Sequence, residues 1–241
     1  TLDLSLDRYL GQLRDAGLGS LPGTAAEILD EEVRSVLCPD KVSPDEWLMV
    51  MKTAHSLGVR TTATIMFGHV DTYAHWARHL ASLRDLQMRT GGFTELVPLA
   101  FVASQAPIYR AGKARPGPTW REALLMHAVA RLALGQWIPN VQASWVKLGA
   151  DGARACFAAG ANDLGGTLMN ESITRAAGAS HGEEMGPTQM EAVIAATGRP
   201  VRQRTTLYRD APAEQRQKSF SAAALDEVVN TPPRKKLSIR V

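Results

Sequence analysis

Residues 43–68 read SPDEWLMVMKTAHSLGVRTTATIMFG, and this stretch decides the fold. Ser43 and Glu46 form a capping-box pattern with a proline at the first helical position, so a helix is predicted to run from there to Gly58. The β-branched run 59–67 follows and predicts a strand. A helix that leads directly into a strand is the unit from which parallel sheets are built.

The same alternation extends over most of the chain. Strands are predicted at 18–23, 59–67, 94–101, 140–146 and 161–164, and further helices at 4–13, 71–86, 119–135, 152–158, 170–177 and 188–197, the last with a capping box at Thr188 and Glu191. A complete eight-unit barrel takes about 250 residues, so five units plus a tail predict an α/β fold that is the C-terminal part of a (β/α)8 TIM-type barrel. An open doubly wound sheet is the alternative, although neither GxGxxG nor GxxxxGKS follows the first strand.

The positive charge is confined to the end of the chain. Residues 1–198 hold 17 Lys and Arg against 20 Asp and Glu, whereas residues 199–241 hold 10 against 4. We therefore expect a slightly acidic body, 1–198, and a basic extension, 199–241, that is solvated and binds no nucleic acid. Within the extension, residues 201–208 alternate as an extended segment that can lie against the barrel, and the chain beyond Asp210 is expected to be loosely ordered.

Other sequence-wide features suggest a cytoplasmic piece of a longer protein. No apolar run approaches the length of a membrane span, and no signal segment precedes the first helix pattern. The chain begins without methionine, inside that pattern. Cys38 and Cys156 stand far apart with no CxxC-type neighbour, and both are predicted to be buried core residues.

Polar residues near the predicted strand ends are the candidates for chemistry. Glu95 lies within an apolar strand, where a carboxylate needs a cation (Lys147 or an arginine) or a ligand. Gln142 and Ser144 share one face of the fourth strand, where a polar ligand and a core hydrogen-bond network are equally good explanations. Asn162 and Asp163 precede two glycines, a pattern that can cradle an anion.

Three histidines are candidates for metal ligands. His69 and Asp71 form an HxD pair after the second strand, as in metal-dependent barrel hydrolases, but those sites need further ligands and only Asp163 is a candidate. A hydrolase is therefore a third hypothesis. His75 and His79 lie one helical turn apart without the glutamate of a zinc-protease helix, and we predict that they face solvent.

Five ordered blocks resemble a known family. They are 20–29 (SLPGTAAEIL), 66–69 (MFGH), 91–101 with 106–109 (APIY), 140–149 (NVQASWVKLG) and 160–178. Together they resemble radical S-adenosylmethionine (SAM) enzymes over residues 2–208, and among these the 4-hydroxybenzyl-transferring half of the FO synthases, which make the deazaflavin precursor of coenzyme F-420. Two menaquinone-pathway relatives, aminofutalosine synthase and dehypoxanthine futalosine cyclase, share some blocks, whereas the text of residues 161–172 favours the deazaflavin branch.

The resemblance implies a radical SAM barrel, a [4Fe-4S] cluster and SAM. It also implies transfer of the 4-hydroxybenzyl group of L-tyrosine to 5-amino-6-(D-ribitylamino)uracil, and a second radical SAM half, fused or separate, that closes the deazaflavin ring. The CxxxCxxC cluster loop and the first three strands of the family are absent from this chain, so its cluster ligands are expected upstream and the isolated chain is expected to be inactive. A non-catalytic barrel fragment is the competing hypothesis. On this resemblance, the SAM and substrate mouth would be lined by His69, Glu95, Gln142, Ser144, Asn162 and Asp163.

Overall fold

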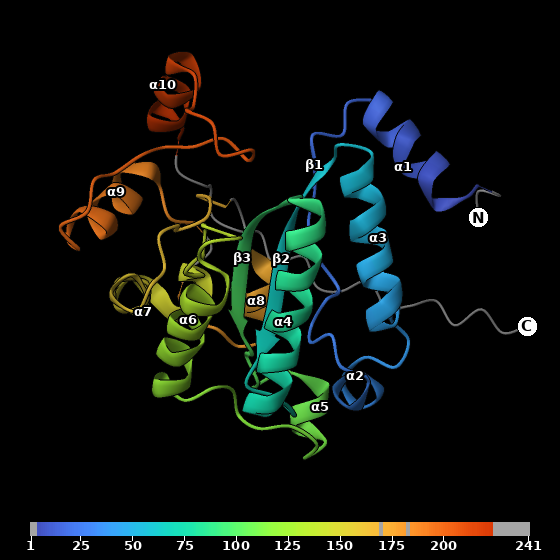
Figure 1. Ribbon diagram of the computed structural model, residues 1–241. Helices are drawn as coiled ribbons and strands as arrows, with labels where there is room; N and C mark the ends of the chain where they lie inside the picture. Colours follow the sequence, from blue (N-terminus) through green and yellow to red (C-terminus); the bar gives the residue numbers. More distant parts are fainter. Residues whose placement is uncertain (1–3, 169–170, 182–183, 224–241) are drawn as a thin grey trace, which may run out of the picture.

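Three parallel strands, β1 (Ser20–Leu21), β2 (Arg60–Phe67) and β3 (Phe93–Ala100), form a sheet in the order β1-β2-β3 (Figure 1). The computed structural model describes residues 4–168, 171–181 and 184–223. Beyond β3 the parallel pairing continues through two single bridges, Leu96 to Val141 and Gln142 to Asp163. All five predicted strand regions therefore take part in parallel pairing, in a mixed α/β fold.

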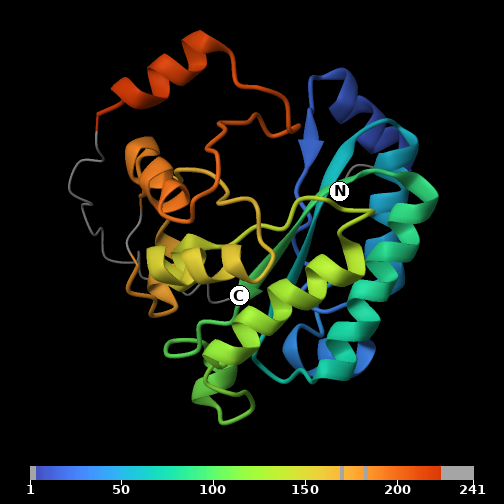
Figure 2. The same ribbon diagram turned by 60° about the vertical axis from the view of Figure 1, so that its left-hand side comes forward.

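Helices cover one face of this sheet. α3 (Pro44–Ser56), α4 (Tyr73–Thr90) and α6 (Trp120–Leu134) lie side by side along the strands (Figure 2). Alternate residues of β2 point toward them, and the buried core joins Ala63, Ile65 and Phe67 to the apolar sides of these helices. Burial of such side chains is the main stabilising contribution to a fold of this kind.

The opposite face of the sheet, here called the inner face, carries the intervening side chains. The register pairs Thr64 with Val97 and Met66 with Leu99, and these residues are only half-buried. Val141 packs into the core on the helix side of the sheet. Because successive strand residues point to opposite faces, Gln142 and its bridge partner Asp163 are on the inner face as well. The inner face is therefore where the polar candidates of different strands can meet.

The remaining helices surround this framework. α7 (Trp145–Ala158) and α9 (Pro187–Ala195) share a second apolar cluster that contains Cys156, and Gly149 interrupts α7 with a φ of 69°. The others are α1 (Leu6–Asp15), α2 (Glu31–Leu37), the short α5 (Pro107–Arg110) and α8 (Ser172–Ala176), and α10 (Ala213–Ser221). Among the described residues, no helix is both long and apolar enough to cross a membrane.

Helix boundaries follow the predicted caps in two of three cases. The capping boxes of Ser43 with Glu46 and of Thr119 with Glu122 both form. The box predicted at Thr188 is wrong: α9 begins one residue earlier, at Pro187, with Gly186 at the N-cap. Proline at the first helical position, with its φ already suited to the helix, decides this start.

Two further expectations need correction, and one helix was not expected. The fourth strand does not reach residue 146, because Trp145 and Val146 already belong to α7. The expected loose order beyond Asp210 is wrong for residues 213–221, which form α10. α2 is not predicted at all, although Asp30 caps it by accepting a hydrogen bond from the Glu32 N–H. The basic run at residues 234–236 lies outside the described residues.

The solvent-facing prediction for His75 and His79 is wrong. Both are buried, because this side of α4 packs against residues 29–32. His79 Nδ1 accepts a hydrogen bond from the Leu29 N–H at 3.0 Å, and burial lowers the pKa of His79 from 6.5 to about 3. The histidine is thus held neutral in the core.

Acid should destabilise the protein through His79. The unfolded histidine takes up a proton below pH 6.5 whereas the folded one stays neutral down to about pH 3, so stability present above pH 6.5 is lost as the pH falls. Between about pH 7.5 and about pH 5, this residue should lower the free energy of unfolding by about 2 kcal/mol. Urea unfolding at both pH values should show a flatter dependence in His79→Gln, which keeps an acceptor but does not titrate. Exposed His181→Gln is the control, and an unchanged pH dependence in His79→Gln would contradict the prediction.

Candidate functional site

The turn after β2 is locked by a buried carboxylate. Asp71 accepts hydrogen bonds from the N–H groups of Gly68 (2.9 Å) and His69 (2.6 Å) and from the indole N–H of Trp76. Burial alone would raise the pKa of Asp71, but His69 and these donors hold it below its usual range. The carboxylate therefore stays ionised and fixes the turn.

His69 belongs to the same turn and is completely buried. Its Nε2 donates to the Met66 carbonyl at 2.9 Å, while Nδ1 accepts from the Val70 N–H at 2.7 Å. Burial lowers the pKa of His69, against the opposing influence of Asp71. Since both ring nitrogens have partners within the chain, His69 shapes the carboxyl edge of the sheet and has no nitrogen left for a metal.

Glu95 and Asp163 meet on the inner face through one arginine. Arg204 binds Asp163 with two nitrogens, one of them at 2.8 Å from Oδ1, and lies 3.4 Å from Glu95 Oε2. Tyr208 donates its hydroxyl to the same Glu95 oxygen at 2.7 Å, and its ring lies 4.0 Å from the guanidinium carbon of Arg204. The predicted extended segment thus does lie against the sheet, and the cation near Glu95 is Arg204.

The surroundings of Glu95 set its charge. Burial raises the pKa of Glu95, Asp163 raises it further, and the Tyr208 and Arg204 contacts only partly oppose this. Its place on the strand also differs from expectation: β3 ends at Ala100, so Glu95 is near the amino end of the strand and not at the carboxyl end. Lys147, the other predicted partner, instead donates to Thr174 Oγ1 at 2.9 Å.

The other candidates are divided between the two sides of the sheet. Gln142 is close to Gly165, because a Cβ added at Gly165 would lie 2.0 Å from the Gln142 Nε2. Ser144 is buried at the start of α7. Asn162 points to the helix side, where its Oδ1 accepts from Arg131 and from the Val141 N–H, both at 2.8 Å. Glu95, Gln142 and Asp163 are therefore brought together, and His69, Ser144 and Asn162 are not part of that group.

The anion-binding turn predicted at residues 162–166 already uses one of its backbone N–H groups within the chain. The Gly165 N–H donates to Asp163 Oδ1 at 2.7 Å, so it is not available to an anion. The pair of polar residues followed by glycines forms a local turn that holds Asp163 in place for Arg204.

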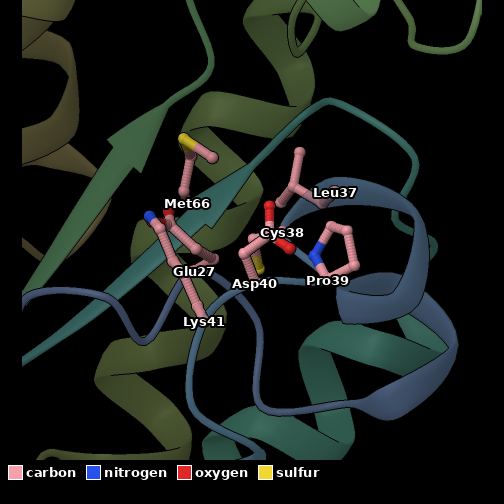
Figure 3. A pocket seen from close by; sticks show the side chains of 7 residues that line it. All are labelled: Glu27, Leu37, Cys38, Pro39, Asp40, Lys41 and Met66. Atoms are coloured by element: carbon pink, nitrogen blue, oxygen red, sulfur yellow. The ribbon is translucent and has the colours of Figure 1, made fainter. Parts of the chain in front are cut away.

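A pocket of about 250 Å³ opens at the carboxyl half of β2 (Figure 3). Figure 3 shows the side chains of Glu27 and Lys41 next to each other beside Met66, and an ion pair of 2.5 Å joins them. The rest of the lining comes from Leu37, Cys38, Pro39 and Asp40. Strands of parallel α/β proteins bind ligands at their carboxyl ends, so this pocket is a candidate site that the sequence patterns did not reveal.

One group of described residues has the composition of a metal site. Asp30, Glu32 and His75 bring their ligand atoms within 4.8 Å of one another. However, His75 Nδ1 accepts the Thr72 N–H at 3.0 Å, so Nε2 carries the proton and donates it toward Glu32. Arg78 also binds Asp30 at 2.6 Å. The imidazole proton and the guanidinium therefore occupy the places that a cation would take in this cluster.

Comparison with known proteins agrees with the resemblance. The family model of the CofH/MqnC C-terminal region matches residues 90–215, just over half of the chain. The chain belongs to this family.

This chain is close in sequence to several curated proteins. It is 54% identical over 203 residues to the 5-amino-6-(D-ribitylamino)uracil--L-tyrosine 4-hydroxyphenyl transferase of Methanopyrus kandleri, covering 84% of this chain and 55% of the relative. It is 52% identical over 211 residues to FO synthase of Streptomyces coelicolor and 51% identical over 205 residues to that of Mycobacterium tuberculosis, covering 88% and 85% of this chain but 24% of each relative. The chain thus spans about half the length of the transferase and about a quarter of the synthases.

The residues missed by sequence reasoning had weak local signals. Glu27 stands within the block 20–29 that carried the resemblance, but an acidic residue in a loop suggests no role by itself. Arg204 and Tyr208 come from the extension and meet Glu95 across more than a hundred residues, which no local pattern reveals.

Proposed function

We propose that this chain is the substrate-side part of a radical SAM transferase that joins the 4-hydroxybenzyl group of L-tyrosine to 5-amino-6-(D-ribitylamino)uracil. The 54% identity over 203 residues to a relative named for these two substrates carries the proposal. The parallel pairing of five strand regions supports a fold that is the C-terminal part of a (β/α)8 barrel, with the body at 1–198 and the extension from 199.

The residues of this chain do not fit a [4Fe-4S] cluster. Such clusters are held by Cys thiolates, usually four. The chain has two cysteines, Cys38 and Cys156; both are buried, and burial raises the pKa of Cys156 to about 12. Ligands for the cluster therefore have to come from residues outside this chain.

The inner face and the carboxyl edge suit polar substrates. An amino acid and a ribityl chain both require fixed donors and acceptors in a pocket that excludes water. Glu95, Gln142 and Asp163 provide carboxylate and amide groups on the inner face. In the proposed enzyme these three contact substrate or SAM, whereas His69 and Asn162 hold the surrounding backbone and Ser144 lies at the start of α7. A second radical SAM half uses the product, and soluble substrates are in keeping with a cytoplasmic enzyme.

A chimeric enzyme tests the proposal. The matching 203-residue region of the Methanopyrus transferase is replaced by the corresponding residues of this chain, so that the relative supplies the remainder. With cluster, SAM and reductant under anaerobic conditions, mass spectrometry should detect the tyrosine-derived adduct of the aminouracil, and its formation should require both substrates. The intact relative is the positive control.

The same assay separates the alternatives. Chimeras are also given the substrates of aminofutalosine synthase and of dehypoxanthine futalosine cyclase, since these relatives share some of the sequence blocks. Turnover of a menaquinone-pathway substrate without the tyrosine adduct would overturn the proposal. A chimera that binds its cluster but transforms none of these substrates would favour the non-catalytic fragment.

A further inference from the structure

The pocket beside Met66 is lined by charges of both signs on an apolar wall. Glu27 and Lys41 form its ion pair, with side chains 17% and 47% exposed, and Asp40 adds a second carboxylate. Leu37, Pro39 and Met66 provide the apolar surface (Figure 3). Its 250 Å³ is below the range of about 300–1,000 Å³ typical of pockets for drug-sized ligands, so it suits a small ligand or one end of a larger one.

A buried arginine joins the two loops that form this pocket. Arg34 is 2% exposed and directs its guanidinium to backbone carbonyls: Ala25 at 3.1 Å, Ala26 at 2.7 Å, and Val42. Taking a charge out of water without a carboxylate partner is energetically costly. The arginine thus ties the loop of Glu27 to the loop of Lys41 at an energetic cost.

The loop of Glu27 is also held in an unfavourable backbone conformation. Ala25 and Glu27 have φ values of 63° and 44°, in the left-handed region that residues with a Cβ rarely adopt. Neighbouring contacts enforce it, since Trp47 Nε1 donates to the Thr24 carbonyl at 2.9 Å and the Met66 N–H to the Glu27 carbonyl at 2.8 Å. Strain of this kind persists where the surroundings over-determine it, and it concentrates at ligand sites.

We infer that this pocket binds the head group of an α-amino acid, with Glu27 accepting hydrogen bonds from its ammonium group and Lys41 donating to its carboxylate. A ligand with a single charge would attract one member of the ion pair and repel the other, whereas a zwitterion complements both. The apolar wall then contacts the rest of the amino acid. The choice of amino acids rests on the proposed function: the pocket takes either L-tyrosine or the methionyl part of SAM.

Calorimetric titration of the full 241-residue chain tests this assignment. The probes are L-tyrosine, tyramine (without the carboxylate), 3-(4-hydroxyphenyl)propanoate (without the ammonium), SAM and 5′-deoxyadenosine. Glu27→Gln should weaken binding of the occupying amino acid about tenfold and leave the probe without an ammonium unaffected, because one charge-assisted contact is lost. Lys41→Met should also weaken binding of the occupying amino acid about tenfold. If tyrosine is the occupant, the affinity for tyramine should not change, because tyramine lacks the carboxylate that Lys41 would bind. Circular dichroism melting checks that each variant remains folded.

The chain offers a matched control pair. Glu214 and Lys218 of α10 form an exposed ion pair of 2.7 Å, so Glu214→Gln and Lys218→Met should change no affinity. An effect on tyrosine alone assigns the pocket to tyrosine, and an effect on SAM alone assigns it to the methionyl group. No binding by the wild type, or equal affinities in the wild type and Glu27→Gln, overturns the inference.

The outcome is independent of the transfer assay. Turnover by the chimera together with unaltered ligand binding in Glu27→Gln would overturn the pocket assignment and leave the proposed function standing. If the chain binds an amino acid in a charge-dependent way but its chimera transfers nothing, the pocket assignment stands and the proposed function is overturned.

Discussion

Replacing Arg204 with methionine should lower the free energy of unfolding by about 3–5 kcal/mol near neutral pH, the loss typical when one partner of a buried ion pair is removed. Arg204 serves both Asp163 and Glu95, whose side chains are 8% and 10% exposed. Methionine fills part of the space but leaves two carboxylates close together without a cation. Urea unfolding followed by circular dichroism measures the loss.

Arg202→Met is the matched control for Arg204→Met. Arg202 pairs with Asp210 at 2.6 Å, but both side chains are largely exposed, so the substitution should change the free energy of unfolding far less than Arg204→Met does.

The pH dependence gives a second check. Burial already raises the pKa of Glu95, and Arg204 opposes this, so removing Arg204 raises that pKa further; the penalty is full at higher pH and shrinks as the pH falls through the raised value. Arg204→Met should therefore lose less stability at about pH 4.5 than at about pH 7.5. A penalty equal to that of Arg202→Met, or one independent of pH, would refute the assigned role.

Gly68→Ala should destabilise the fold by about 2–5 kcal/mol, the combined cost of left-handed backbone strain and overpacking. Gly68 has a φ of 96°, and a Cβ there would lie 2.3 Å from the ring of Pro118. Pro118 belongs to the loop before α6, so the clash would separate that loop from the turn held by Asp71. Thermal and urea unfolding report the loss.

Gly58→Ala separates backbone strain from crowding. Gly58 has a φ of 77°, but a Cβ at this position would meet nothing within 4 Å. It should cost about 1–2 kcal/mol, from strain alone. Equal losses in the two alanine variants would show that the contact with Pro118 is unimportant.

Much of the fold could be predicted because its signals are local. The capping box of Ser43 with Glu46 and the β-branched run after Gly58 depend on residues a few positions apart, and helix and strand appeared where expected. The fourth strand was predicted too long, because alternation around Gln142 and Ser144 is equally compatible with an extended residue before a helix. α2 escaped prediction since seven residues give little periodicity.

The candidate site was predicted less completely. Glu95 was selected because a carboxylate is costly among apolar residues, and Asp163 because it stands at the end of the last strand before two glycines. The structure shows both buried and paired. His79 was misjudged because a helix pattern does not reveal that the Leu29 N–H lies against that side of α4. Asn162 was selected with its neighbour Asp163, but adjacent strand residues point to opposite faces, and its partner is Arg131.

The sequence by itself determined most of the helices and strands in their order, the parallel sheet and membership of the family, because caps, periodicity and ordered blocks are all properties of neighbouring residues. Only the tertiary structure decided which charges meet. Arg204 reaches Glu95 across 109 positions and Lys41 reaches Glu27 across 14, with Arg34 holding the intervening loops together. Such pairs depend on the path of the chain in three dimensions, since an ion pair forms wherever packing brings opposite charges within about 4 Å, whatever their separation in sequence.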